Sequence, residues 1–248
     1  MNLGIGRLTN IYSGGTGKSE KLSATLEVQK KETVEKLIDD MLNSPDPDIQ
    51  LEATKKLGKF SKNMPQEGID ALIKAMRRVG STDFTELEAI KILGKIGPRA
   101  KGAIPHLTTC LEYNHMPFKQ AEAAKALGGI GIPDEKAIHF LREKLKKDDE
   151  LPVIRSSAAW ALGKLKDYGA SSILADWVNH DETDQFIRAR CAEALGNLGV
   201  IRINDRLNKE LDEKVSAGLL EASKNENKFI RYAAEQAIRK RIIDMCPK

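Results

Sequence analysis

Aromatic side chains and cysteines are both scarce in this sequence of 248 residues. Phe, Trp and Tyr make up only 5% of the chain, less than one large core usually contains, whereas thin helical layers can be filled by Ala and Leu. The three cysteines, Cys110, Cys191 and Cys246, are odd in number and widely spaced. The sequence therefore predicts neither a disulfide framework nor a cysteine metal site, and a reducing compartment is the simplest interpretation.

Long apolar runs and a strong excess of one charge are also lacking. No stretch approaches the roughly 18 apolar residues of a membrane span, and the first residues have no secretory apolar run. The net charge of +4 is too small for a protein coated with basic residues for nucleic acid. Residues 1–30 are rich in Gly, Ser and Thr, so we expect a flexible N-terminal tail. We expect a cytoplasmic protein; a mitochondrial targeting segment is the alternative, which the glycines of this tail disfavour.

Motifs that would support catalysis are incomplete. Residues 13–19 resemble a phosphate-binding loop, but Tyr12 stands where that loop requires its first Gly, and no strand precedes it. None of the four histidines is followed by Glu, and no two of them are four residues apart, so neither a di-iron nor a zinc site is predicted. We therefore predict a protein that is not an enzyme, with no catalytic residue, no metal and no cofactor.

One short pattern, Ala-Leu-Gly followed by a variable and then a branched apolar residue, recurs along the chain. Its apolar anchors are Leu57, Leu93, Leu127, Leu162, Leu195 and Ile238. The anchors are 33 to 36 residues apart until the last interval, which is 43 residues, and this spacing fits two helices and two turns per unit. We expect partner helices near residues 33–43, 66–79, 101–112, 134–146, 169–179 and 206–223, and no strands. The wide last interval suggests an insertion in the charged run from Arg206 to Lys214.

The composition around each anchor explains why helices would form and stack. Ile154, Ala158, Ala161 and Leu165 fall at helical spacing and give the helix one apolar face. Ala at contact positions lets helices approach closely, and the Gly after each anchor suits either a tight crossing or a helix end. The last helix, over residues 239–244, is expected to present a basic, polar side as a terminal cap. The predicted fold is all-α, a right-handed superhelical solenoid of about six helix pairs over residues 31–248.

The segments 47–49, 97–107 and 154–163 resemble HEAT repeats of the phycobilisome-lyase-like type, and the resemblance extends over about residues 33–245. It implies that the Ala-Leu-Gly helices line the concave surface. It also places Arg155, Arg188 and Arg231 where the family often has an inter-repeat ladder. Because Gln50, Glu86 and Gln120 stand at that place in the other repeats, we expect the ladder only in the C-terminal half.

Two columns of residues flank the anchors, two positions before and two positions after, one helical turn apart on the same face. Their basic and aromatic members in the first four repeats are Lys55, Lys59, Lys91, Lys95, Lys125, Trp160 and Lys164. Lysines beside a rigid aromatic are typical of a partner-binding surface. The alternative is a solvated face, because a Glu precedes each of Lys55, Lys91 and Lys125 by three residues. Trp160, likewise, either contacts a partner or packs against the neighbouring repeat.

These observations favour a protein-binding adaptor or assembly scaffold whose concave face holds an acidic partner protein. Binding of a nucleic-acid backbone through the same basic columns is one alternative. A bilin-lyase-type enzyme or cofactor-attachment chaperone is another, and it rests on the resemblance alone.

Overall fold

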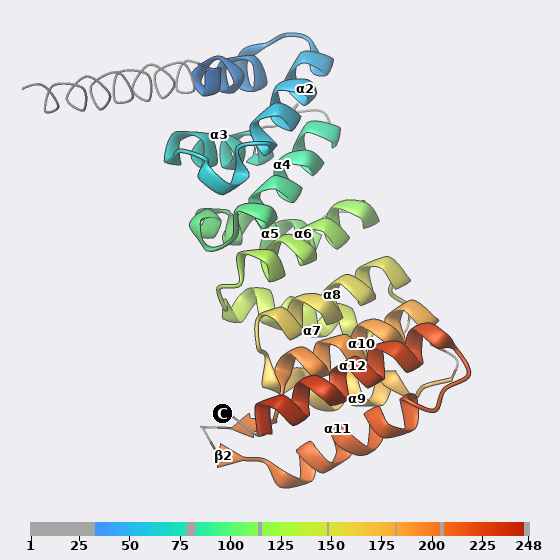
Figure 1. The fold of residues 1–248 in the computed structure, drawn as a ribbon. Coiled ribbons are helices and arrows are strands. Elements are labelled where there is room, and N and C mark those ends of the chain that lie inside the picture. The colour runs from blue at the N-terminus through green and yellow to red at the C-terminus, as the bar shows by residue number, and fades with distance from the viewer. Residues whose placement is uncertain are drawn as a thin grey trace, which may run out of the picture.

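The computed structural model describes residues 33–77, 83–113, 116–147, 149–181, 183–203 and 206–245. The tail expected over residues 1–30 lies outside these ranges. The described residues form two layers of helices that stack side by side into a solenoid, as Figure 1 shows. The predicted all-α solenoid is thus confirmed.

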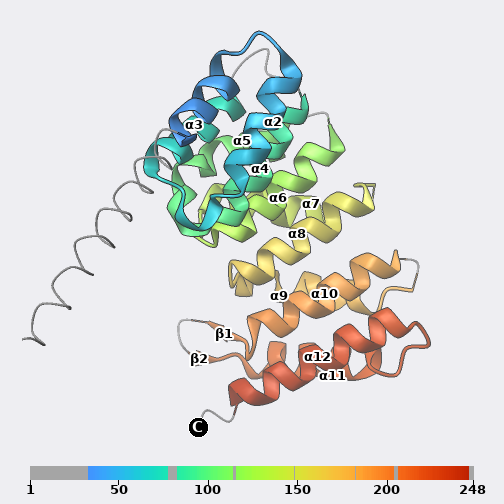
Figure 2. The ribbon, with the colours of Figure 1, turned by 45° about the horizontal axis from the view of Figure 1, so that its top comes forward.

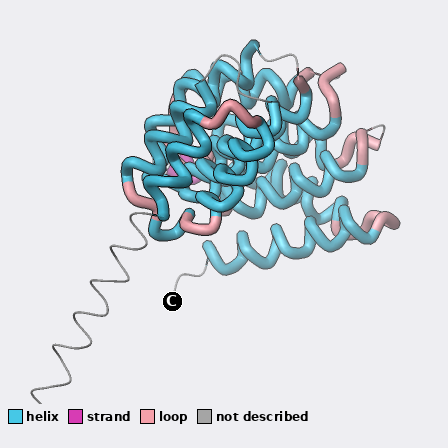
Figure 3. The backbone as a smooth tube through the Cα atoms, turned by 90° about the horizontal axis from the view of Figure 1, so that it is seen from above, coloured by secondary structure: helices cyan, strands magenta, loops and turns pink. Residues whose placement is uncertain are grey.

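The helices alternate between the two layers along the chain. The inner layer, which carries the anchors, consists of α2 (Pro47–Gly58), α4 (Asp83–Ile96), α6 (Pro117–Ile130), α8 (Pro152–Lys164), α10 (Gln185–Leu198) and α12 (Lys228–Met245). The outer layer consists of residues 33–43, α3 (Gln66–Arg77), α5 (Ile104–Tyr113), α7 (Glu135–Lys146), α9 (Ser171–Val178) and α11 (Lys209–Ala222). Three short 3-10 turns, η1 (Ser61–Asn63), η2 (Gly97–Ala103) and η3 (Tyr168–Ala170), lead from inner to outer helices. Seen from above, the loops lie mainly along two opposite edges of the stack (Figure 3).

Local chemistry sets the start of most helices. Proline occupies the first turn of α2, α6 and α8, where its missing N–H has no intrahelical partner to lose. The side chain of Asp46 accepts the N–H of Asp48, and that of Asp184 accepts the N–H of Phe186. These are N-caps, which satisfy backbone donors that the helix leaves open.

The glycine after each leucine anchor allows adjacent inner helices to approach closely. A Cβ atom on Gly128 would lie 2.8 Å from the Cα of Ala161, and one on Gly163 would lie 2.7 Å from the Cα of Ala194. Both glycines lie inside their helices. Of the two roles expected for this glycine, the structure therefore shows the tight crossing. Figure 2 shows the result, with α8, α10 and α12 as successive members of one layer.

The last repeat corrects one expectation. We expected no strands, but β1 (Arg202–Ile203) and β2 (Arg206–Leu207) pair antiparallel between α10 and α11. The charged run from Arg206 to Lys214, where we expected the inserted residues, forms β2 and the first turns of α11. That helix begins at Lys209 because the side chain of Asn208 caps it, accepting the N–H of Leu211. The added length lies in the hairpin connection and in α11 itself, which has 14 residues where α9 has 8.

The core is a continuous strip between the two layers, and it contains the five leucine anchors. The terminal helix α12 matches the expected polar cap in part. Arg239 and Lys240 are exposed, as expected. Arg241, however, is buried and donates to the backbone oxygen of Gly199 and to the carboxylate of Asp212, whereas Ile242 and Ile243 are exposed. Arg241 is buried because α11 and the segment after α10 offer it acceptors, which the local sequence does not reveal.

Candidate functional site

The exposed surface of the inner helices, here called the inner face, carries the residues predicted as a binding site. Lys55 lies on α2 with Lys59 directly after it, Lys91 and Lys95 on α4, Lys125 on α6, and Trp160 and Lys164 on α8. The structure brings four of them together, because Lys91, Lys95, Lys125 and Trp160 line one hollow of about 290 Å³. Lys164 lies beside them, with its Nζ atom 5.5 Å from the centroid of the Trp160 ring. Lys55 and Lys59 stand one repeat away from this hollow.

Part of the lysine charge is neutralised within the helices. Lys91 Nζ lies 3.7 Å from the carboxylate of Glu88, and Lys125 Nζ lies 2.8 Å from that of Glu122. Such exposed pairs contribute little to stability, but they reduce the positive field at the surface. In α2 the corresponding glutamate pairs with Lys56 and not with Lys55.

In the column two residues after the anchors, the charges of Lys59 and Lys95 are not neutralised in this way within the described ranges. Among the residues that the structure describes, no carboxylate lies within ion-pair distance of Lys59 or Lys95. The same holds for Lys55 and Lys164 in the described part of the chain, so these four ammonium groups are the ones most available to a partner.

Trp160 contacts both the neighbouring repeat and the open surface. Its Cζ3 atom would lie 2.8 Å from a Cβ on Gly128, so one edge of the indole packs against α6. The ring also lines the hollow of about 290 Å³ and a larger one of about 720 Å³. Trp160 therefore packs against the neighbouring repeat with one edge and also leaves part of its ring open to a partner.

The larger hollow shows that the inner face is concave. Its walls include Lys125 of α6, Trp160 of α8, Phe186 of α10 and Phe229 of α12, which come from four successive inner helices. A single hollow can touch four stacked helices only where their common face curves inward. Arg190, paired with Glu193 at 2.5 Å, also lines it. Aromatic rings beside charged groups are the composition expected of a protein interface.

Sequence reasoning missed a column of phenylalanines on the inner face. The residue nine positions before each anchor is the second residue of its inner helix, and in four repeats it is an exposed phenylalanine: Phe84, Phe118, Phe186 and Phe229. The sequence does contain a signal for this column, because phenylalanine recurs nine residues before four of the anchors. The lysine and tryptophan columns lie two residues from the anchors, whereas the phenylalanine column lies nine residues before them, at the other end of each inner helix.

The arginines expected as a ladder make two kinds of contact. The guanidinium of Arg155 lies 3.9 Å from the ring centroid of Trp177 in α9, so it reaches the next repeat. Arg188 donates to the backbone oxygen of Val178, and Arg231 to that of Asn225, both within their own repeats. The same tie from an inner helix to the end of the preceding outer helix occurs in the N-terminal half. There Gln50 Nε2 donates to Ser44 O and Gln120 Nε2 donates to Leu111 O.

The two cysteines that the structure describes, Cys110 and Cys191, are half-buried and buried, respectively. Burial raises the pKa of the Cys191 thiol to about 12 and, together with the charge of Glu86, that of Cys110 to about 11. Both thiols are therefore protonated near neutral pH and are weak nucleophiles. No group of three or more His, Cys, Asp or Glu is placed to hold a metal ion in the residues that were described. In the same residues, no helix is long and apolar enough to cross a bilayer.

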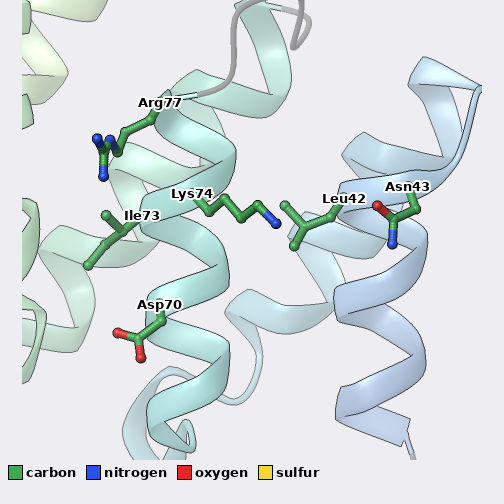
Figure 4. Close-up of a pocket in the computed structure, with 6 residues that line it drawn as sticks. All are labelled: Leu42, Asn43, Asp70, Ile73, Lys74 and Arg77. Atoms are coloured by element: carbon green, nitrogen blue, oxygen red, sulfur yellow. The ribbon is translucent and has the colours of Figure 1, made fainter.

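A further hollow, of about 770 Å³, lies in the outer layer between residues 33–43 and α3 (Figure 4). Lys74 extends across it toward Leu42, while Asp70, Ile73 and Arg77 point to the other side of α3. Its walls come from only two helices and contain no aromatic side chain. We therefore place the candidate site on the inner face.

Solved structures with the same architecture include three informative cases. The complex of CpcE and CpcF of phycocyanin lyase from Nostoc sp. PCC7120 aligns with a TM-score of 0.58 at 21% identity, over 81% of this chain and 74% of that one. A designed armadillo repeat protein in complex with the peptide (KR)4 aligns with a TM-score of 0.56 at 19% identity, over 83% and 98%. Kap95p, an importin-beta of yeast, aligns in its RanGDP complex with a TM-score of 0.55 at 16% identity, over 86% and 29%.

These identities are low enough that the likeness concerns the fold alone. Comparison with curated proteins finds no match. At the level of sequence, the family model for HEAT repeats matches residues 117–196, which span α6 to α10 and the larger part of the concave hollow. The sequence match places HEAT repeats in residues 117–196, and helix pairs of the same solenoid architecture continue on both sides of that segment.

Proposed function

We propose that this protein is a non-catalytic scaffold whose concave inner face holds a segment of a partner protein. The observation that carries the proposal is the hollow of about 720 Å³ that runs across four inner helices and is lined by Trp160, Phe186 and Phe229. Large aromatic side chains in a concave, partly charged surface are the groups that most often dominate protein–protein binding energies. A stack of repeats presents such a surface over a long distance, because each repeat adds a few side chains to it.

Proteins with the same fold give this proposal a precedent. The designed armadillo repeat protein was solved with a bound peptide, and Kap95p was solved with RanGDP. For this chain we propose a partner with acidic side chains opposite Lys59 and Lys95, because the surface offers these ammonium groups without internal carboxylate partners among its described residues. Complementary charges would steer the partner to the face and fix its register.

Charge reversal on α4 tests the proposal. The Lys91→Glu/Lys95→Glu variant should bind a fluorescein-labelled, glutamate-rich peptide about tenfold more weakly than the unaltered protein, because two attractive charges become repulsive. Fluorescence anisotropy at low and at physiological ionic strength gives the affinity and its salt dependence, which should also become flatter. Lys36→Glu/Lys74→Glu, which reverses two exposed charges of the outer layer, is the matched control and should leave affinity unchanged.

Two results would count against this assignment. If the Lys91→Glu/Lys95→Glu variant bound the peptide as tightly as the unaltered protein, the lysine columns would not be part of the binding surface. Tighter binding of a single-stranded oligonucleotide than of the acidic peptide, lost steeply with added salt, would favour nucleic-acid binding instead.

A further inference from the structure

The phenylalanine column runs along one margin of the inner face. Four of the six phenylalanines of the chain occupy the same place, the second residue of an inner helix. Their exposed fractions are 70% for Phe84, 71% for Phe118, 59% for Phe186 and 52% for Phe229. We call these four residues the phenylalanine track.

Helix formation does not account for these side chains. The first turn of a helix favours acidic residues and small polar caps, and α2 follows that rule with Asp48 at this place. A large apolar side chain there adds nothing to the cap and remains in contact with water. Exposed apolar residues that recur in register mark an interaction surface, whereas single exposed ones need no explanation.

The spacing of the track matches that of an extended peptide. The rings of Phe186 and Phe229 are neighbours, with centroids 6.4 Å apart. Stacked helices are separated by about 8–10 Å, and three residues of an extended or polyproline-type chain cover about 9–10 Å. A segment in the extended polyproline-type conformation has three residues per turn, so every third side chain would lie on one face and opposite a new repeat.

The track is interrupted once, and the interruption opens a socket. In α8 the corresponding residue is the smaller, half-buried Val153, which lines the hollow of about 720 Å³ together with Trp160, Phe186 and Phe229. The socket thus lies between Phe118 and Phe186 and is walled by aromatic rings. A bulky apolar side chain of a partner would be surrounded there on several sides.

The charges beside the track select the kind of partner. In the turns that lead into the inner helices and in the first two residues of those helices, exposed carboxylates outnumber exposed ammonium groups among the described residues. The carboxylates are Asp46, Asp48, Asp149, Asp181, Asp184 and Glu226, and the ammonium groups are Lys147, Lys224 and Lys228. Asp46 and Asp184 cap helices and Asp181 lies 3.2 Å from the guanidinium of Arg188, but all six carboxylates remain exposed to solvent. A segment with basic side chains would complement this margin, whereas an acidic one would be repelled.

We propose that the phenylalanine track docks an extended partner segment that carries a bulky apolar side chain at every third residue and basic side chains between them, with one apolar side chain inserted in the socket at Val153. This inference rests on the proposed function and makes it more specific. The lysines at the other end of the inner helices would contact acidic side chains of the partner, so that the two margins together fix its orientation.

Filling the socket tests the proposal with a substitution that the fold accommodates. Val153→Phe places a phenylalanine where four other inner helices already carry one, so the helix pair should form normally. The probe is a labelled peptide of repeated Leu-Lys-Ser units, compared with an isomer that has leucine at every fourth residue and with a peptide of Leu-Glu-Ser units. We expect the Leu-Lys-Ser peptide to bind about tenfold tighter than either, and Val153→Phe to weaken its binding about tenfold.

A second variant and a control separate binding from folding. Phe118→Ser/Phe186→Ser should weaken the Leu-Lys-Ser peptide to a similar extent. Leu220→Ser, which removes a comparably exposed apolar side chain from α11, should have no effect. Circular dichroism and thermal unfolding should show the same fold for all variants.

Equal binding of the three peptides, absence of binding, or unchanged affinity of Val153→Phe would each overturn the proposal. Failure here is distinguishable from failure of the proposed function, because Val153→Phe leaves the lysine columns intact. If the acidic peptide still binds and Lys91→Glu/Lys95→Glu still weakens that binding, the proposed scaffold function stands and only the proposed role of the phenylalanine track is refuted.

Discussion

Single polar residues connect adjacent repeats inside the otherwise apolar stack. Lys119 of α6 extends into the preceding repeat, where its Nζ atom lies 2.5 Å from Oε2 of Glu86 in α4. The two side chains are only 7% and 16% exposed, so the carboxylate of Glu86 depends on Lys119 for compensation of its charge. This pair differs from the helix-surface pairs of the same chain, whose partners are largely in water.

Removing the lysine should therefore destabilise the protein strongly. We expect Lys119→Met to lower the free energy of unfolding by about 3 kcal/mol, because the carboxylate of Glu86 would remain buried without its partner. Lys146→Met, which breaks the exposed pair with Glu143, is the matched control and should cost less than about 0.5 kcal/mol. Urea unfolding followed by circular dichroism measures both, and equal costs for the two variants would show that burial does not strengthen the pair.

Between elements, the crossing of inner helices depends on glycine meeting alanine. At Gly163 an added Cβ would meet the Cα and Cβ atoms of Ala194 at 2.7 and 2.8 Å, and a backbone atom cannot rotate away. At Gly58 the corresponding neighbour is the side chain of Ile92, at 3.0 Å. The glycine position of the repeat thus tolerates an added Cβ atom in some copies and not in others, depending on which atoms of the next helix lie against it.

The contrast predicts opposite outcomes for one substitution at two equivalent places. Gly163→Ala should destabilise by about 1–2 kcal/mol, because overpacking exceeds the gain of about 1 kcal/mol from better helix propensity. Gly58→Ala should be neutral or slightly stabilising, because Ile92 can change its rotamer. Thermal unfolding of both variants checks this. If Gly163→Ala were as stable as the unaltered protein, the close crossing of α8 and α10 would be disproved.

Across the whole molecule, each repeat packs mainly on its neighbours. α6 contacts α4 and α8 in the inner layer, while α12 contacts α10 and α11. In such a stack the stability of a segment depends on its own repeat and on the adjacent interfaces. A substitution at one interface between repeats should therefore lower the stability of the adjacent helices only. A substitution in the core of a globular domain would lower the stability of the whole domain.

Hydrogen exchange should reveal this limited range. In Lys119→Met we expect faster amide exchange in α4 and α6, next to the lost ion pair, and unchanged exchange in α11 and α12 at the far end. Mass spectrometry of peptic fragments resolves these helices separately. A uniform increase over all helices would mean that the array unfolds as one cooperative unit.

The sequence by itself determined the helix pairs, their number and most of their boundaries. These features follow from repeat period, apolar spacing and N-caps such as Asp46 and Asp184, which act within a few residues. It also located the lysine columns and Trp160, because residues at equal places in a stacked repeat share a face.

Only the tertiary structure decided which of these residues meet. The burial of Arg241, the pairing of Lys119 with Glu86 and the hollow beside Val153 all depend on contacts between residues of different helices. The same holds for the hairpin between α10 and α11, which the spacing of the anchors signalled only as extra length. Local pattern specifies a helix and its apolar side, but the partner of a side chain is set by the neighbouring repeat across the crossing.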